Sequence, residues 1–265
     1  MAPVTARPRL LGVGYATEGF GFGRVFRSLY QRLGARWEIE HLEFSPPYTP
    51  APDSPWRVHF TRRPAPRLGH LEFTELLDRR RPDLVFFSVD LWQLPPYLRA
   101  LASAVPAPRV IAYCPVDGPL TNCPGLDDLR VLDCLVVPTR FGQAQVTGGL
   151  ARRSIQFSTA VEVIPHGVDS DRFYPYEDTV EQTRRQRARV ELFPHQPELV
   201  DGFIVLNANR NQPRKRLDLT LQGFAQFAAG KPRGVKLLLH SGTIDLGSNT
   251  VALANELGVL DRVLR

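Results

Sequence analysis

The chain has 265 residues, of which 43% are hydrophobic and 23% charged, which is enough for one large or two small domains with ordinary cores. This composition excludes an intrinsically disordered chain, and no apolar run reaches the roughly 18 residues that a membrane-spanning helix needs. The formal charge of +6 permits an acidic partner but does not identify one.

The three cysteines, Cys114, Cys123 and Cys134, indicate neither a disulfide framework nor a zinc site, because their number is odd and they form no C-x-x-C pair. The N-terminus lacks the apolar segment of a signal peptide. We therefore expect a reduced, cytoplasmic protein with no metal site. Peripheral contact with the inner face of a membrane stays open.

Strands and helices alternate through the first 170 residues. A first strand at 9–16 leads through a glycine-containing loop into a helix. Further strands are expected at 37–44, 83–90, 109–116, 133–139 and 161–164. Helices are expected at 71–80, after the strand at 83–90, and from Phe141; Pro95 and Pro96 should interrupt the second of these helices. The proline-rich segment 45–66 is expected to be loop, with at most a short strand at 56–61. This alternation predicts a Rossmann-like α/β domain.

The loop after the first strand carries Gly19, Gly21 and Gly23. Their spacing is not G-x-G-x-x-G, so the dinucleotide fingerprint is absent, although Glu43 ends the second strand about where a ribose-binding acid would lie. The glycines form either a flexible turn or a point of close backbone approach to a phosphate or sugar. We favour the second interpretation because Arg24 follows them and opens the helix.

Ligands of parallel α/β sheets bind beyond the carboxyl ends of the strands. That edge is expected to carry Gly21, Asp90, Asp117, Thr139 and His166. Each polar residue also has a simpler explanation: Asp90 can cap the next helix and Asp117 can form a turn. His166 can equally pack between domains, in which case the backbone at Gly167 is the better candidate for ligand contact.

From residue 171 the chain is expected to enter a second α/β domain. A polar helix at 180–192 precedes an apolar strand at 203–207, a basic loop and a helix that ends at Ala229; a strand at 235–240, a helix at 249–257 and a strand from 262 follow. The arginine run 184–189 is interpreted as the solvated face of the polar helix, with nucleic-acid binding as the less favoured alternative.

The basic loop places Arg210, Arg214 and Lys215 before a helix start. The first-turn N–H groups and the positive end of a helix dipole favour an anion, and the cations add charge and directed donors. The segment therefore predicts a phosphorylated ligand. The apolar stripe that should bury the helix is Leu217, Leu221, Phe224 and Ala228.

Two segments of the chain resemble hallmarks of the retaining GT-B glycosyltransferases of the family-4-like group (glycosyl transferases group 1). The run PHGVDSDRFYP from Pro165 resembles their interdomain signature, and the run NRNQPRKRLDLTLQGFAQF from Asn209 resembles their donor-phosphate loop and helix. The resemblance implies an α/β, GT-B fold of two Rossmann-like domains. Residues 1–170 would form the acceptor-side domain and residues 171–265 an incomplete donor-side domain.

The resemblance also implies the reaction, in which a sugar moves from a nucleotide-diphosphate sugar to a hydroxyl acceptor (a sugar, lipid or protein) with retention. Arg210 and Lys215 would neutralise the leaving phosphates, Arg214 would assist or face solvent, and Gly21 and Gly23 would approach the donor. The family is usually metal-independent at this step, so no cofactor is expected.

The chain departs from the family at two places. Many relatives carry a His-containing segment where this chain has Asp117, which is therefore offered only as a sugar-contacting or acceptor-orienting residue. The Glu-x7-Glu signature of the nucleoside half is absent from these residues, so we expect either a fragment or a domain completed by another chain. The alternative function is a non-catalytic GT-B-like binding or partner subunit.

Overall fold

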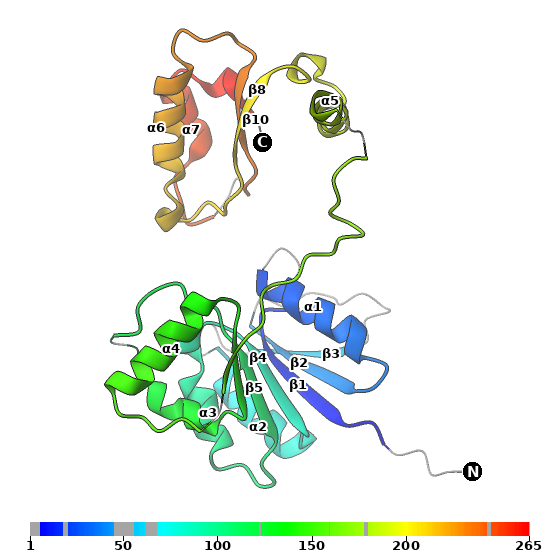
Figure 1. Ribbon diagram of the computed structural model, residues 1–265, viewed down its shortest axis with the longest axis vertical. Coiled ribbons are helices and arrows are strands. Elements are labelled where there is room, and N and C mark those ends of the chain that lie inside the picture. The colour runs from blue at the N-terminus through cyan, green and yellow to red at the C-terminus, as the bar shows by residue number, and fades with distance from the viewer. Residues whose placement is uncertain are drawn as a thin grey trace, which may run out of the picture. The chain divides into compact units, whose positions relative to one another are not determined.

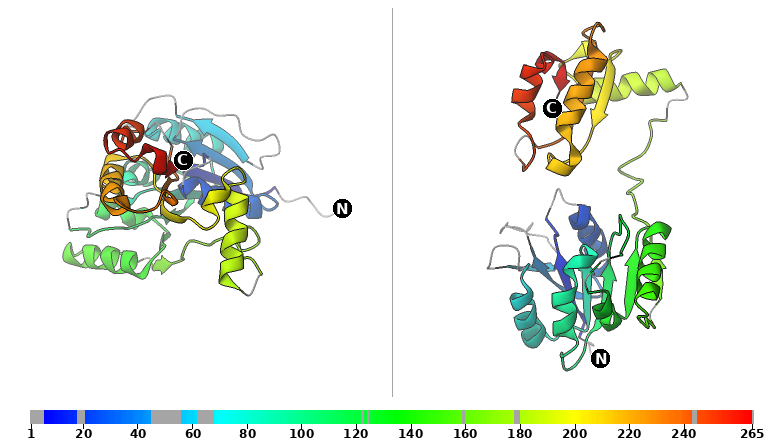
Figure 2. Two further views of the ribbon diagram at one scale, coloured as in Figure 1. Left: turned by 90° about the horizontal axis from the view of Figure 1, so that it is seen from above. Right: turned by 90° about the vertical axis from the view of Figure 1, so that its left-hand side faces the viewer.

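The computed structural model describes residues 6–17, 21–44, 56–61, 68–121, 123, 125–158, 160–177, 180–242 and 245–264. Gly19 and most of the proline-rich segment lie outside these ranges. The chain divides into two compact units, residues 1–168 and 169–265 (Figures 1 and 2). None of the helices in the described ranges is both long and apolar enough to cross a membrane.

Unit 1 is built on a seven-stranded sheet in which every neighbouring pair of strands is parallel. The strands are β1 (Arg9–Gly14), β2 (Glu38–Glu43), β3 (Trp56–Phe60), β4 (Leu84–Ser88), β5 (Arg109–Tyr113), β6 (Cys134–Val137) and β7 (Val161–Val163). Their order is β3-β2-β1-β4-β5-β6-β7, so the direction in which strands are added reverses between β1 and β4. This is the doubly wound architecture that the sequence predicts.

Helices cover both faces of this sheet because successive strand residues point to opposite sides and both sides are apolar. Phe26 and Tyr30 of α1 (Gly21–Leu33) form one cluster with Leu10 and Ile39. The other face carries the larger core, which Leu11 and its neighbours share mainly with four helical elements (Figure 1). These are α2 (His70–Arg80), α3 (Pro95–Leu101), the 3-10 helix η2 (Leu126–Val131) and α4 (Arg140–Arg152).

Two expectations about unit 1 were wrong. Gly21 and Gly23 belong to the first turn of α1 and not to the loop before it. Pro95 and Pro96 begin α3 instead of interrupting it, because the first turn of a helix does not use its N–H groups and proline lacks one. The short strand within the proline-rich segment is confirmed as β3, which pairs with β2.

Unit 2 contains a parallel sheet of three strands in the order β10-β9-β8. They are β8 (Phe203–Asn207), β9 (Val235–Leu239) and β10 (Val263–Leu264). The helices α6 (Leu217–Ala228) and α7 (Thr250–Glu256) pack on one face, where the predicted stripe of α6 is buried. The opposite face carries Leu206, whose side chain is 60% exposed. Within the described ranges, β8 has a strand partner on one side only.

The polar helix α5 (Glu181–Leu192) has no buried residue among those described, in agreement with the solvated face that the sequence predicts. Two arginines one turn apart attach it to the rest of unit 2. Arg185 donates to the Gly202 carbonyl at 2.9 Å, and Arg189 donates to the Leu199 carbonyl at 2.9 Å.

Candidate functional site

Unit 1 offers one candidate region, the carboxyl edge of its sheet at the switch point between β1 and β4. Gly14 ends β1 with a φ of +148°, and a Cβ added there would lie 2.7 Å from the carbonyl oxygen of Ser88, which ends β4. A larger residue would separate the two strands, so glycine is required. In doubly wound folds, ligands bind in the crevice outside strand ends at this switch point.

A buried carboxylate holds the segment that leaves β1. Oε2 of Glu43, which is fully buried at the end of β2, accepts a hydrogen bond from the Ala16 N–H at 2.8 Å. Glu43 is thus used inside the protein, and its burial does not favour contact with a ribose. A Cβ added at Gly23 would lie 2.2 Å from the Thr17 carbonyl oxygen, whereas one added at Gly21 would meet open space. Of these two glycines, Gly21 is therefore the one whose surroundings can admit a ligand.

A buried, neutral histidine, His41, contacts the end of β1. Tyr30 donates its hydroxyl proton to Nδ1 of His41 at 2.8 Å, and Nε2–H of His41 donates to the Gly14 carbonyl at 3.2 Å. Burial lowers the pKa of His41 to about 3 despite the hydrogen bond to Gly14, which acts in the opposite direction. Gly12 leaves room for the tyrosine hydroxyl, since an added Cβ would lie 1.6 Å from that oxygen. The carbonyl that ends β1 is thereby fixed in direction.

Asp90 and Thr139 have local structural roles. Asp90 caps the 3-10 helix η1 (Leu91–Gln93) in a capping box, in which its N–H donates to the Gln93 side chain at 2.9 Å. Thr139 Oγ1 accepts a hydrogen bond from the Gly142 N–H at 2.9 Å and caps α4. The capping explanation for Asp90 is thus confirmed. Asp117 lies exposed in the segment after β5, and a role in sugar contact stays a prediction.

His166 and Gly167 lie just beyond β7 and are both exposed. The Tyr113 hydroxyl donates to the Ile164 carbonyl at 2.9 Å and lies 3.0 Å from Nδ1 of His166, which can donate to the hydroxyl oxygen when it carries the proton. The two rings meet edge to face, with centroids 5.3 Å apart. Tyr113 thus joins the carboxyl end of β5 to the segment after β7.

Unit 2 offers a separate candidate region, the segment between β8 and α6. It contains the 3-10 turn η4 (Pro213–Lys215) and then Arg216 in a left-handed conformation, with φ of 49°, as the residue before α6. Asn207 at the end of β8 donates to the Thr220 hydroxyl at 2.8 Å, which ties the strand to the first turn of α6. Lys215 is the last residue of η4, so it lies in the turn before α6.

This segment is attached to the chain near residue 247. Asn211 is 2% exposed, and its side chain donates to the Ser248 carbonyl at 2.8 Å while its own carbonyl accepts from the Gly247 N–H at 2.9 Å. Nε of Arg210 donates to a carboxylate oxygen of Asp245 at 3.2 Å. The loop that carries the basic residues is thus attached to the segment 245–248 by a part-buried hydrogen bond of the Asn211 side chain and an exposed one of Arg210.

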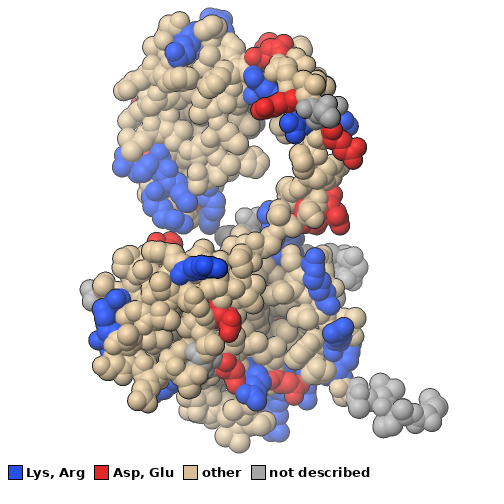
Figure 3. Space-filling view, viewed as in Figure 1, with Lys and Arg blue, Asp and Glu red and all other residues tan. Residues whose placement is uncertain are grey.

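The four basic side chains of this segment differ in their partners. Arg210 pairs with Asp245, and Arg216 pairs with Asp218 at 2.8 Å, which lowers the pKa of that carboxyl. For Arg214 and Lys215, the described part of the chain offers no ion-pair partner. Figure 3 shows Lys and Arg side chains gathered at the end of unit 2 where this segment lies. Two uncompensated cations beside a helix start make this surface attractive to phosphate.

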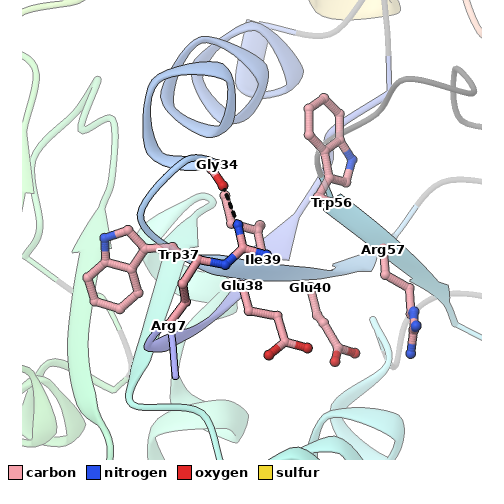
Figure 4. A pocket seen from close by; sticks show the side chains of 8 residues that line it. All are labelled: Arg7, Gly34, Trp37, Glu38, Ile39, Glu40, Trp56 and Arg57. Carbon is pink, nitrogen blue, oxygen red and sulfur yellow. Dashed lines mark hydrogen bonds between the residues drawn. The ribbon is translucent and has the colours of Figure 1, made fainter. Parts of the chain in front are cut away.

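A cavity of about 430 Å³ lies at the other edge of the unit 1 sheet, where β2 and β3 begin (Figure 4). In Figure 4 the side chains of Glu38 and Glu40 point to one side of the sheet and Trp56 to the other. Glu40 is already paired with His59 and with Arg80. Because no predicted site residue lines this cavity and it lies at the amino ends of strands, we do not assign it to the site.

In the described ranges, histidine, cysteine and acidic side chains form no group of three or more that could hold a metal ion. The metal-independent reaction nevertheless stays a prediction.

Sequence reasoning missed Asp245 and Asn211. No local pattern links them to their partners, because the contacts span more than 30 residues of chain. An aspartate next to the loop Gly247-Ser248-Asn249 is a weak signal that could only have suggested a turn.

No protein-family model matches the sequence, and no curated protein does. Solved structures do match. An α,α-trehalose-phosphate synthase (UDP-forming) from Burkholderia vietnamiensis is 16% identical with a TM-score of 0.59, and the match covers 97% of this chain and 68% of that one. HepE of Anabaena in complex with UDP and glucose is 15% identical with a TM-score of 0.58, covering 98% and 68%.

A third structure, of a trehalose-6-phosphate synthase studied for glycosyltransfer with retention, is 13% identical with a TM-score of 0.58, covering 94% of this chain and 67% of that one. These neighbours are GT-B glycosyltransferases, and the likeness shows that this chain has the GT-B fold. The chain spans about two thirds of the length of the neighbours.

Proposed function

We propose that this chain acts in a retaining glycosyltransferase that moves a hexosyl group from a nucleotide-diphosphate sugar to a hydroxyl acceptor. One observation carries the proposal: in a chain with the GT-B fold, Arg214 and Lys215 lie without an ion-pair partner, among the described residues, directly before the start of α6. A dianionic leaving group is the ligand that such a surface favours.

The basic segment would stabilise the negative charge that develops on the departing diphosphate. Lys215 would supply a point charge and Arg214 further donors. Arg210 is held by Asp245, so that its guanidinium is oriented before any ligand binds, and a diphosphate would share it with that carboxylate. The first-turn N–H groups of α6 add donors that need no counter-charge.

The carboxyl edge of unit 1 would position the sugar and the acceptor. Gly21 offers backbone without a side chain in open space, and Asp117 offers an exposed carboxylate that can accept hydrogen bonds from sugar hydroxyls. A front-face displacement with retention needs no separate general base, so positioning and charge stabilisation supply most of the rate. A neighbour that was studied for glycosyltransfer with retention supports this stereochemistry, and one in complex with UDP and glucose supports a uridine donor.

The test is binding of UDP and of pyrophosphate to the full chain, measured by calorimetry. The double variant Arg210→Ala/Lys215→Ala should bind both at least tenfold more weakly, because each lost charge-assisted hydrogen bond is worth on the order of 1.5 kcal/mol. The matched control is Lys231→Ala/Arg233→Ala, which removes the same charge beyond the other end of α6 and should change affinity little.

Equal loss in the two double variants would show that net charge and not the segment binds the ligand, and would refute the assignment. Turnover is measured separately, as release of UDP from UDP-glucose in the presence of hydroxyl acceptors. Binding that depends on Arg210 and Lys215 without any turnover would favour the non-catalytic binding subunit over the enzyme.

A further inference from the structure

Helix α1 and the residues that directly follow it concentrate positive charge. Residues 21–36 contain no aspartate or glutamate and four arginines, which are Arg24, Arg27, Arg32 and Arg36. Four positive and no negative charges give this short segment a formal charge of +4, against +6 for the whole chain. Figure 3 shows Lys and Arg side chains along the side of unit 1 where α1 lies.

The packing of α1 turns this charge outward. Phe26 and Tyr30 are fully buried in the cluster between the helix and the sheet, so the opposite side of α1 faces solvent. Arg24 is exposed in the first turn, Arg32 is exposed in the last turn, and Arg36 is exposed just beyond the helix. A helix of 13 residues is about 20 Å long, so the cations are spread over a surface of about that length.

The helix dipole explains only part of this pattern. The negative end of the dipole favours cations in the last turn of α1, where Arg32 lies, and just beyond it, where Arg36 lies. The positive end disfavours a cation in the first turn, yet Arg24 lies there and no acidic residue accompanies it. A role in helix stability therefore does not account for an arginine at both ends.

The contacts of three of these cations leave their charge in place. Arg7 donates to the Gly34 carbonyl at 2.9 Å, and Arg32 donates to the Ser28 carbonyl at 2.8 Å. A carbonyl directs a guanidinium but does not neutralise it. Among the ion pairs of the described residues, none includes Arg7, Arg32 or Arg36.

Helix α5 also has four arginines but not the same excess of charge. Glu181 and Glu191 reduce the formal charge of its residues to +2. Arg185 and Arg189 attach α5 to the rest of unit 2, and Arg187 lies 3.8 Å from a carboxylate oxygen of Glu191. The one-signed face of α1 is therefore not a general property of an arginine-rich chain.

The acidic residues that follow α1 in the sequence lie away from it. Glu38 and Glu40 point to one side of the sheet and Trp56 to the other (Figure 4). The ring of Trp56 packs on Tyr30 of α1, with centroids 5.2 Å apart, so the two carboxylates are on the far side of the sheet from the helix. Trp37 follows Arg36 and is half-buried, and a partly exposed indole is a side chain that favours the interface between membrane and water.

A flat anionic surface suits α1 better than a nucleic acid does. A helix that enters the major groove, which is about 12 Å wide, must stand clear of its own domain, whereas α1 packs on the sheet. Single strands bind to exposed aromatic side chains, and the exposed residues of α1 include none: they are Gly21, Arg24, Ser28, Gln31 and Arg32. Each arginine near an anionic bilayer contributes roughly fivefold in affinity.

We propose that unit 1 docks on an anionic phospholipid surface through the outer face of α1. The arginines of residues 21–36 and Arg7 face the lipid phosphates, and no helix inserts into the bilayer. This inference goes beyond the proposed function and does not depend on it, because it uses no residue of the basic segment in unit 2.

The experiment measures sedimentation of the full chain with two kinds of vesicle. One is pure phosphatidylcholine, and the other contains roughly three parts phosphatidylcholine to one part phosphatidylglycerol. The native chain should bind the anionic vesicles at least tenfold more tightly, and raising NaCl from about 0.1 M to about 0.5 M should remove most of this binding. Arg32→Gln/Arg36→Gln should weaken it at least tenfold, at roughly fivefold for each arginine.

The matched control is Arg140→Gln/Arg152→Gln, which removes the same charge from exposed positions of α4 and should keep binding within about twofold. Arg32→Lys/Arg36→Lys keeps the charge and should keep binding within about threefold, which separates charge from damage to the fold. Equal affinity for the two kinds of vesicle, or equal losses in the α1 and α4 double Gln variants, overturns the proposal.

Two further outcomes also overturn it. Binding of a DNA duplex of about 20 base pairs that depends on Arg32 and Arg36, without vesicle binding, identifies a nucleic-acid partner instead. Loss of vesicle binding in Arg210→Ala/Lys215→Ala, with binding kept by Arg32→Gln/Arg36→Gln, assigns the docking surface to unit 2. The proposed function is tested separately, since Arg32→Gln/Arg36→Gln should leave UDP affinity unchanged.

Discussion

Acidification should destabilise unit 1 through His41, whose pKa falls from 6.5 to about 3 because the imidazole is fully buried. Burial is the largest cause; the hydrogen bond to the Gly14 carbonyl raises the pKa of His41 and the charge of His59 lowers it further. Above pH 6.5 the imidazole is neutral in both the folded and the unfolded state, and its contribution to stability is complete. As the pH falls from 6.5 towards 3, only the unfolded state takes up the proton, so stability is lost.

The expected size follows from 1.36 kcal/mol per pH unit. Between pH 6.5 and pH 5 the loss is about 2 kcal/mol for this one group. The variant His41→Gln keeps an N–H donor and an oxygen acceptor but cannot titrate. The difference in free energy of unfolding between the native chain and this variant should therefore shrink by about 2 kcal/mol from pH 7 to pH 5.

Urea unfolding followed by tryptophan fluorescence isolates this effect, because Trp37, Trp56 and Trp92 all belong to unit 1. The control His195→Gln removes an exposed histidine of unit 2 and should leave the unit 1 transition unchanged at each pH. If the native chain and His41→Gln lose stability in parallel between pH 7 and pH 5, the conclusion that His41 is buried in its neutral form is refuted.

Three further substitutions test the packing beside β1 in unit 1 and the attachment of the basic loop in unit 2. Gly12→Ala should lower the free energy of unfolding of unit 1 by roughly 1–3 kcal/mol, because the new Cβ would lie 1.6 Å from the Tyr30 hydroxyl oxygen. The control Gly21→Ala, where the space is open, should leave that free energy unchanged. Equal urea midpoints for the two variants would contradict this prediction. Asn211→Ala should destabilise unit 2 by roughly 1–3 kcal/mol, because the Ser248 carbonyl loses its partner, and should weaken UDP binding; unchanged thermal unfolding by circular dichroism would disprove the bracing role.

Most of the fold could be predicted because its signals are local and periodic. The stripe from Leu217 to Ala228 recurs at helical spacing, and all four of its residues are buried. Helix starts were harder. Gly21 and Gly23 suggest a loop because glycine is a poor helix former, but the contact of Gly23 with the Thr17 carbonyl requires the small residue inside the first turn of α1.

The candidate site residues also differ in whether the sequence could predict them. The basic residues between β8 and α6 could be found from the strand–loop–helix pattern, and the capping role of Asp90 from its place at a strand end. The partners could not be found. Asp245 lies 35 residues from Arg210, and the hydrogen bond from Ala16 to Glu43 depends on the pairing of β1 with β2.

The open side of β8 affects how copies of this protein can meet. Among the described residues, the N–H and C=O groups of β8 that point away from β9 pair with no strand, and Leu206 on the uncovered face adds an apolar surface beside them. Two copies that met edge to edge about a twofold axis would place β8 against β8 in opposite directions. The resulting sheet would be twice as wide, with an antiparallel seam between two parallel halves. Such a dimer could form only while no other polypeptide segment pairs with that edge, so self-association and any other strand addition would compete for the same strand.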